Sequence, residues 1–280
     1  MTPPLSPRIL LLDIDGTLVN YGTQLPASAA AAVRQARANG HRVYLCTGRA
    51  RAEIYPELWE LGVDGMIGGN GSYVEHDGQV VHHQVLDAEV VDRALAWLDA
   101  QRLGYFVECN SGLFASDDFP VKAASIYGEP DAASITRIVS MIPVLVYRRP
   151  APRDDVNKIS FVLEPEVDLE QLARDFAGEA AISTWTATGR RQEFGEFGQL
   201  GVHKGVAVRR LAEHLGVSTA EMIGFGDALP DLELLQTCGT AVAMGGAPPE
   251  LVAVADLVTD HVDDDGLANA FARLGLIQAR

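Results

Sequence analysis

A short apolar run followed at once by acidic residues constrains this chain more than any other feature. Residues 9–12 are Ile-Leu-Leu-Leu, a run typical of a buried strand, and the Gly16 beyond it indicates a turn. Side chains alternate along a strand, so Asp13 and Asp15 share a face at its carboxyl end. In open α/β sheets, ligand sites lie in the crevice at the carboxyl ends of the strands. The run therefore predicts a site with two carboxylates at one edge of a sheet.

These acidic residues indicate a site for phosphoryl transfer. Asp227 supplies a third carboxylate, and carboxylates that share a crevice repel one another unless a cation lies between them. Mg²⁺ prefers hard oxygen ligands, keeps several waters and binds through one or two carboxylates together with substrate phosphate. We therefore expect Mg²⁺ as the cofactor and a phosphorylated compound as the substrate.

Four motifs follow one another along most of the chain. They are Asp-Ile-Asp-Gly-Thr at 13–17, Thr47-Gly48-Arg49, His203-Lys204-Gly205, and Gly226-Asp227 followed by Asp231. In this order, each after a predicted strand or at a predicted helix start, they resemble the haloacid dehalogenase (HAD) superfamily. Three C-terminal segments resemble its Cof-like, type IIB capped sugar-phosphate phosphatases: 240–245, 255–259 and 265–266.

The resemblance implies a role for each motif residue. Asp13 would be the nucleophile that forms an aspartyl-phosphate, and Asp15 would be the general acid/base. Thr47 would bind the transferred phosphoryl group, Lys204 would offset negative charge, and Asp227 would bind the metal. The implied activity is Mg²⁺-dependent hydrolysis of small phosphomonoesters, with sugar phosphates as the expected substrates.

Neighbouring residues would complete this site. The implied metal ligands are Asp13, Asp15 and Asp227. Asp231 would be a supporting acid beside them, and Gly48 and Asn70 would contribute contacts to the phosphate.

The chain departs from the family at two positions near the expected metal and phosphate. The family usually has Asn where this chain has Pro230, and again Asn where it has Gly246. Proline lacks a backbone donor and glycine lacks a side-chain group, so other atoms or water must take over their contacts. The departures affect the expected metal affinity and rate more than the class of reaction.

The order of predicted elements indicates an α/β fold: a Rossmann-like parallel-sheet HAD core with an inserted α+β cap domain. The core comprises residues 1–82 and 195–280, and the cap comprises 83–194. The predicted core strands are 5–12, 42–46, 65–67, 222–225 and 241–244, with a hairpin over 73–81. The predicted core helices are 26–39, 51–61, 204–214, 231–236, 249–254 and 266–274.

The order of predicted helices and strands in the cap differs from that in the core. The position of the cap between the second and third motifs resembles that of the large cap of the Cof-like group. Its predicted helices are 90–98, 118–127 and 169–176. Its predicted strands are 105–109, 143–147, 158–163 and 182–186. In this interpretation the cap closes over the substrate, excludes water and selects the leaving group.

Composition restricts the partners. The 280 residues carry 22 Lys and Arg against 38 Asp and Glu, a formal charge of −16, which argues against a nucleic-acid partner. Cys46, Cys109 and Cys238 have no metal-binding spacing and suit a reducing compartment. The N-terminus lacks a signal pattern, and no apolar run is long enough for a membrane span. We expect a cytoplasmic monomer or homodimer that binds a small phosphorylated metabolite and no membrane.

Two other functions stay open at this point. A phosphomutase of the phosphomannomutase type would need a second phosphate clamp in the cap, built from several arginines. The cap has these, but scattered: Arg137, Arg148, Arg149, Arg153, Arg190 and Arg191. A non-catalytic ligand sensor on the same fold is favoured only by Pro230 and Gly246. Taken singly, each motif also has a simpler interpretation, such as a turn at Asp15-Gly16 or a solvated Lys204.

Two further polar groups are assigned structural roles. The histidines at 76, 82 and 83 are interpreted as a solvated hairpin, because adjacent side chains on a strand point to opposite faces. The acidic run 263–265 precedes a predicted helix and is interpreted as its N-terminal cap with first-turn acids.

Overall fold

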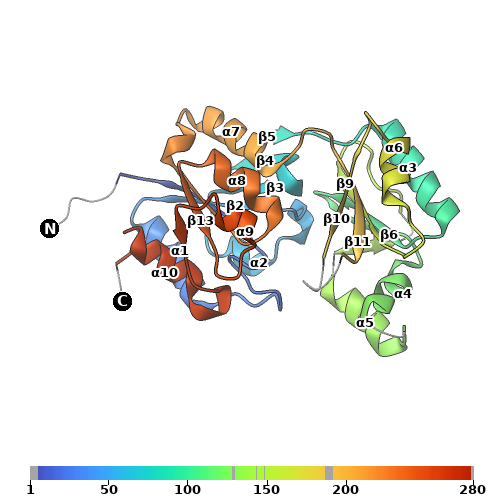
Figure 1. The fold of residues 1–280 in the computed structure, drawn as a ribbon, viewed down its shortest axis with the longest axis horizontal. Coiled ribbons are helices and arrows are strands. Elements are labelled where there is room, and N and C mark those ends of the chain that lie inside the picture. The colour runs from blue at the N-terminus through green and yellow to red at the C-terminus, as the bar shows by residue number, and fades with distance from the viewer. Residues whose placement is uncertain (1–5, 128–129, 143, 148, 187–191, 279–280) are drawn as a thin grey trace. The chain divides into compact units, whose positions relative to one another are not determined.

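The chain forms two compact units, each with its own sheet (Figure 1). A computed structural model describes residues 6–127, 130–142, 144–147, 149–186 and 192–278. The eight-stranded unit consists of Met1–Gly48, Tyr55–His83 and His203–Arg280. The six-stranded unit consists of Arg49–Ile54 and Gln84–Val202. The fold class is α/β with a large, mostly parallel sheet, as the sequence predicts.

The larger sheet has the strand order β14-β13-β12-β1-β2-β3-β4-β5. Its strands are β1 (Ile9–Leu12), β2 (Arg42–Cys46), β3 (Gly65–Gly68), β4 (Tyr73–His76), β5 (Gln79–His83), β12 (Met222–Gly226), β13 (Thr240–Ala243) and β14 (Leu257–Val258). Neighbours from β14 to β3 are parallel, and the β4–β5 hairpin completes one side in antiparallel pairing. All four residues of the central β1 are buried, as expected for a parallel strand covered on both faces.

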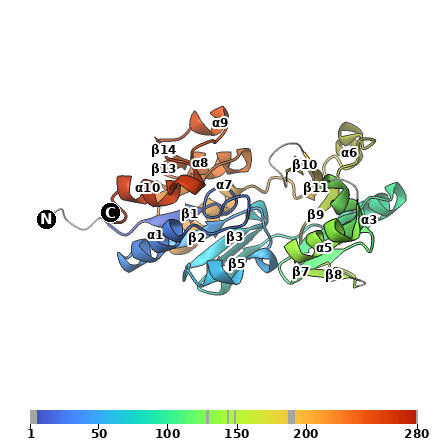
Figure 2. The ribbon, with the colours of Figure 1, turned by 90° about the horizontal axis from the view of Figure 1, so that it is seen from below.

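Helices cover both faces of this sheet (Figures 1 and 2). They are α1 (Ala27–Ala38), α2 (Pro56–Trp59), α7 (Lys204–Leu215), α8 (Leu232–Thr237), α9 (Pro249–Val252) and α10 (Gly266–Arg273). On one face Leu11 shares a buried cluster with Val208 of α7 and Leu234 of α8. On the opposite face, the ring of Phe225 lies 5.2 Å from that of Phe271 in α10, and α10 contacts α1. The burial of both faces fixes the strand order that positions the site.

The smaller sheet has the order β10-β11-β9-β6-β7-β8 and is antiparallel except between β7 and β8. Its strands are β6 (Tyr105–Cys109), β7 (Gly112–Ala115), β8 (Leu145–Tyr147), β9 (Val156–Val162), β10 (Ala181–Trp185) and β11 (Phe194–Gly198). Its helices are α3 (Ala88–Gln101), α4 (Phe119–Ala124), α5 (Ala132–Met141) and α6 (Leu169–Asp175). Ile159 and Phe161 of β9 pack with Leu172 of α6, whereas Val162 faces the other way and packs with Phe119 of α4. This alternation places helices on both faces of the central strand.

The single helix predicted over 51–61 is wrong. The structure has one 3₁₀ turn at Arg51–Glu53 and a separate short helix that begins at Pro56. Proline lacks the backbone N–H that a helix interior needs, and Tyr55 before it is extended. Ala50 is buried in an apolar cluster of the six-stranded unit, which explains why this segment leaves the eight-stranded unit.

Three elements of the six-stranded unit were not predicted: β7, β11 and α5. β11 has glycine at two of its five positions, a composition that is depleted in strands, so its signal is weak. It pairs with both β9 and β10, and the six-stranded unit therefore continues to Val202. The sequence placed that boundary between residues 194 and 195. The predicted strands at 42–46 and 105–109 are confirmed without change.

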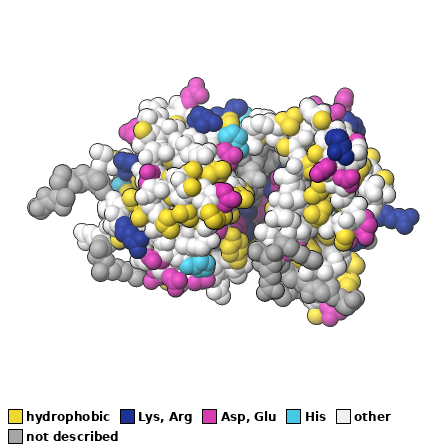
Figure 3. All heavy atoms as spheres, viewed as in Figure 1, with side chains coloured by type: hydrophobic (Ala, Val, Ile, Leu, Met, Phe, Trp, Pro, Cys, Tyr) yellow, Lys and Arg dark blue, Asp and Glu magenta, His cyan; other side chains and the backbone are white. Residues whose placement is uncertain are grey.

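Two surface properties follow from these units. Within the described ranges, every helix is too short or too polar to cross a lipid bilayer. On the face shown in Figure 3, Asp and Glu side chains lie scattered among apolar and uncharged ones, and the coloured Lys and Arg side chains lie in separate places.

Candidate active site

Three of the predicted site residues follow three adjacent parallel strands. Asp13 follows β1, Thr47 follows β2, and Asp227 follows β12. The sheet order β12-β1-β2, with Leu12 in register with Phe225, brings the strand ends to one edge. The Asp13 N–H donates to the Phe225 carbonyl at 3.0 Å, which extends the ladder into the site. The expected meeting of the motifs at one sheet edge is therefore found.

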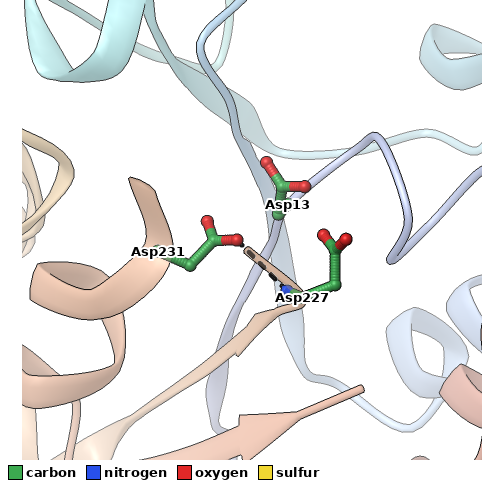
Figure 4. A group of neighbouring side chains, drawn as sticks. All are labelled: Asp13, Asp227 and Asp231. Atoms are coloured by element: carbon green, nitrogen blue, oxygen red, sulfur yellow. Dashed lines mark hydrogen bonds between the residues drawn. The ribbon is translucent and has the colours of Figure 1, made fainter. Parts of the chain in front are cut away.

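A cluster of three carboxylates occupies this edge. Oxygens of Asp13, Asp227 and Asp231 all lie within 4.8 Å of one another, and Figure 4 shows the three side chains side by side. Asp13 is 7% exposed. Burial raises the pKa of Asp13 well above its usual range; Asp231, Asp227 and Asp15 raise it further, and Lys204 opposes them. Such a group needs nearby positive charge to stay ionised.

Lys204 supplies one buried positive charge. It is the first residue of α7, and its Nζ donates to Asp13 Oδ1 at 2.7 Å and to Asp231 Oδ1 at 2.6 Å. Burial alone lowers the pKa of Lys204, but the two carboxylates outweigh burial and hold this pKa well above its ordinary value. The lysine therefore stays protonated and compensates part of the carboxylate charge.

Asp231 is fully engaged with protein donors. Its Oδ1 accepts from Lys204, while its Oδ2 accepts the N–H groups of Asp227 at 3.1 Å and Ala228 at 3.2 Å. The carboxylate thus holds the lysine and the turn after β12 in place. This contact set suits the supporting role that the resemblance implies for Asp231.

Asp227 faces the opposite side of the cluster. Its Oδ1 accepts from the Thr17 hydroxyl at 3.3 Å, and its Oδ2 accepts from the Tyr21 hydroxyl at 2.7 Å. Burial raises the pKa of Asp227 to about 6, with the Tyr21 hydrogen bond opposing that shift. Burial and the adjacent carboxylate also raise the pKa of Tyr21, so this phenol stays protonated and donates. Tyr21 was missed from the sequence because a lone tyrosine in a turn carries no motif.

The backbone conformation at position 16 and the space beside it explain why the first motif has a glycine there. Its φ is +88°, and a Cβ built there would lie 2.1 Å from Asp227 Oδ2. The position therefore requires both a left-handed backbone and open space beside a carboxylate. The turn closes through the Gly16 N–H to the Val19 carbonyl at 2.7 Å.

Asp15 lies within the same turn. The structure pairs its backbone with Val19 and leaves its side chain half-buried. The third carboxylate grouped with Asp13 and Asp227 is that of Asp231, whereas the sequence named Asp15 as the third metal ligand. Asp231 reaches the cluster from the residue before α8.

Thr47, Gly48 and Asn70 form a second group. Thr47 is 1% exposed, and its carbonyl accepts the Asn70 N–H at 3.1 Å. A Cβ at Gly48 would lie 3.0 Å from Asn70 Oδ1. A Cβ at Gly71 would lie 2.5 Å from the His203 carbonyl, so the Asn70 turn also lies against the start of α7. The sheet thus gathers the predicted phosphate contacts around the segments that carry Thr47 and Lys204.

The two departures from the family are compatible with this backbone. Pro230 is exposed in the first positions of the 3₁₀ turn Leu229–Asp231, where a missing N–H costs no hydrogen bond. Gly246 has a φ of +90°, a conformation that glycine adopts without strain. Both positions therefore accommodate the local turn and leave the carboxylates and Lys204 in contact.

Comparisons with known proteins identify the family. A model of the family of haloacid dehalogenase-like hydrolases matches residues 10–271. The HMP-PP phosphatase of Citrobacter koseri is 28% identical, with 88% of this chain and 87% of that protein covered. Phosphatase YwpJ of Bacillus subtilis is 25% identical over 95% of this chain and 99% of its own length.

A solved structure shows the same fold. The HAD subclass IIB sugar phosphatase BT4131 has a TM-score of 0.75 and 24% identity, covering 96% of this chain and 100% of that one. The family match spans nearly the whole chain, and the motifs that carry the resemblance meet at one sheet edge. The chain belongs to the haloacid dehalogenase-like hydrolases, and is an enzyme of that family.

Proposed function

We propose that the chain is a Mg²⁺-dependent phosphatase that hydrolyses small phosphomonoesters, sugar phosphates first, through an aspartyl-phosphate on Asp13. One observation carries the proposal: the Asp13 carboxylate lies 2.7 Å from a buried Lys204 Nζ, in one cluster with Asp227 and Asp231. The phosphatase names of the relatives support the same activity. The substrate class is proposed from the likeness to a sugar phosphatase.

The donor set fits Mg²⁺. Asp13 and Asp227 offer hard carboxylate oxygens, and the lysine leaves part of the negative charge uncompensated. When bound there, Mg²⁺ would supply positive charge next to the phosphoryl oxygens. We propose Asp13 and Asp227 as its side-chain ligands; Asp15 and Asp231 are placed beside them.

The proposed reaction has two displacements at phosphorus. An Asp13 oxygen attacks, its O–P bond forms as the ester P–O bond breaks, and Asp15 gives its proton to the leaving oxygen. Asp15 then takes a proton from water, the water oxygen attacks phosphorus, and the Asp13 O–P bond breaks. Free Asp13 carboxylate and inorganic phosphate result. Thr47 and Lys204 would hold the phosphoryl oxygens, and the six-stranded unit is proposed as the cap that selects the leaving group.

Phosphate release tests this proposal. A panel of sugar phosphates and other small phosphomonoesters is assayed with Mg²⁺ and with chelator, for the wild type, Asp13→Asn and Glu108→Gln. Glu108 is a matched control, because it is a buried carboxylate 3.3 Å from a lysine in the six-stranded unit. We expect Mg²⁺-dependent release that falls roughly a thousandfold or more only in Asp13→Asn. Release that survives this substitution, or none from any ester by the folded wild type with Mg²⁺, contradicts the proposal.

The phosphomutase alternative would need free arginines for a second phosphate. Among the described residues, Arg153 is engaged, since its guanidinium lies 2.8 Å from Asp92, and Arg149 is exposed. Arg148, Arg190, Arg191 and the side chain of Arg137 lie outside the described residues. Isomerase activity that depends on glucose-1,6-bisphosphate would favour the mutase, and metal binding without turnover would favour the ligand sensor.

A further inference from the structure

The turn that follows the first motif places a tyrosine on the candidate metal ligand. The Tyr21 hydroxyl donates to Asp227 Oδ2 at 2.7 Å, a shorter contact than the 3.3 Å bond from Thr17 to Oδ1. We propose that Tyr21 is a positioning residue that holds the Asp227 carboxylate in the orientation required to bind the cation. The inference rests on the proposed role of Asp227 as a Mg²⁺ ligand.

The turn itself is built to hold this tyrosine. Asn20 Oδ1 accepts the N–H groups of Gly22 at 3.0 Å and Gln24 at 2.9 Å, and the Asn20 carbonyl accepts the Thr23 N–H at 2.8 Å. Thr23 has a φ of +63°, so the chain reverses tightly here. Tyr21 therefore lies in a turn whose backbone conformation is fixed on both sides of it.

A second contact anchors the turn to a distant segment. Asn20 Nδ2 donates to Asp263 Oδ1 at 2.8 Å, and Asp263 belongs to the 3₁₀ turn Val262–Asp264. The interpretation of 263–265 as a side-chain cap is wrong, since Asp265 precedes α10 without a capping side-chain hydrogen bond, and Asp263 instead binds Asn20. The turn that carries Tyr21 is therefore anchored through Asn20 to Asp263. Among the contacts described, Asp263 makes none with Asp227.

The exposure of Tyr21 indicates that this residue acts through its contact with Asp227 and contributes little to core packing. Its side chain is among the exposed large hydrophobic ones, at 54%, so it contributes little buried apolar area to stability. Its hydrogen bond to Asp227 is an exposed one, so its loss costs little folding free energy. Loss of the Tyr21 hydroxyl should therefore change the orientation of the Asp227 carboxylate and leave the fold intact.

The test compares Mg²⁺ binding by calorimetry in the wild type and four variants of the full chain. Groups that orient a metal ligand typically contribute about 10- to 100-fold in affinity. For Tyr21→Phe we expect a loss near the lower limit, about tenfold, because this contact is half-exposed. The urea concentration at the midpoint of unfolding without Mg²⁺ should stay that of the wild type. Asp263→Ala should weaken Mg²⁺ binding in the same direction but by less.

Tyr105→Phe is the matched control. The Tyr105 hydroxyl donates to Asp99 Oδ1 at 3.1 Å, the same chemical pair in the six-stranded unit. Its loss should leave Mg²⁺ affinity unchanged. A kinetic measurement adds a second criterion: for Tyr21→Phe the Mg²⁺ concentration at half-maximal rate should rise in parallel with the dissociation constant.

Two negative results have different meanings. If the folded wild type does not bind Mg²⁺, or if Asp227→Asn binds it as tightly as the wild type, the proposed function fails. If the wild type binds Mg²⁺ through Asp227 and Tyr21→Phe binds it equally well, only the positioning role of Tyr21 is overturned. Unchanged affinity in Asp263→Ala would overturn the anchoring of the turn by Asp263.

Discussion

Each unit of this protein buries a lysine between two carboxylates, and the two clusters behave differently. Lys204 contacts Asp13 at 2.7 Å and Asp231 at 2.6 Å at the edge of the parallel sheet. Lys158 contacts Glu196 at 2.6 Å and Glu108 at 3.3 Å within the antiparallel sheet. The ion-pair geometry alone does not distinguish a catalytic site from a structural one.

The surroundings make the distinction. At the parallel edge Asp227 adds a third carboxylate, with an oxygen within 4.8 Å of those of Asp13 and Asp231. In the six-stranded unit the Ser160 hydroxyl donates to Glu108 at 2.6 Å, and burial raises the pKa of Glu108 to about 8. Within the described residues, no other group of three acidic, His or Cys side chains has this spacing, so we expect a divalent cation at the first cluster alone.

Removal of each lysine should give the largest contrast. Lys204→Met and Lys158→Met each leave buried carboxylates without their cation, which costs about 3–5 kcal/mol of unfolding free energy. Only Lys204→Met should also abolish phosphate release, because only Lys204 contacts the proposed nucleophile. Urea unfolding and turnover, measured at a temperature where each variant stays folded, check both. Lost turnover in folded Lys158→Met would remove the distinction between the clusters.

Metal addition should stabilise through the first cluster alone. At a Mg²⁺ concentration about 100 times the dissociation constant, the unfolding free energy should rise by about 2.7 kcal/mol, and a chelator should reverse it. Asp227→Asn should remove most of this gain, whereas Glu196→Gln, at the other lysine, should keep it. The measurement is urea unfolding with and without Mg²⁺. An equal loss in both variants would contradict the assignment.

Each of the two lysine clusters has a glycine close to it, and substitution of these glycines tests the difference between the clusters. A Cβ at Gly16 would lie 2.1 Å from Asp227 Oδ2, and one at Gly195 would lie 2.1 Å from the ring of Phe161. Gly16→Ala and Gly195→Ala should each cost about 1–3 kcal/mol from overpacking. Gly16→Ala should in addition weaken Mg²⁺ binding, since Asp227 must move. Calorimetry and urea unfolding on the same samples separate the two effects, and undiminished Mg²⁺ affinity in Gly16→Ala would contradict this reasoning.

The last expected contrast is the pH dependence of Glu108. Burial raises its pKa to about 8, with Glu53 and Glu196 adding and Lys158 opposing, so the folded state keeps a proton that the unfolded chain releases. Stability from this group is present at low pH and is lost as pH rises toward 8, by up to about 1.4 kcal/mol per pH unit. Glu108→Gln should flatten this part of the profile between pH 5 and 8. Identical wild-type and variant slopes in urea unfolding would refute the shift.

Local sequence patterns were sufficient for much of the eight-stranded unit. The strand Arg42–Cys46 and the hairpin around Asp77-Gly78 are confirmed, and the strand predicted over 5–12 is found at Ile9–Leu12, its apolar part. The predictions were poorer where the local signal is weak. β11, with two glycines in five residues, was missed, and Pro56 divided a helix predicted as continuous.

What the sequence by itself determined is the family, the α/β class and the identity of the acidic and basic residues that form the site. Only the tertiary structure decided which of them touch. Lys204 and Asp13 are 191 residues apart, and Tyr21 and Asp227 are 206 apart. These contacts depend on the order β12-β1-β2, which is set by burial of both sheet faces. Strand order is a non-local property, so no short segment specifies that Asp231 joins the cluster or that Tyr21 donates to Asp227.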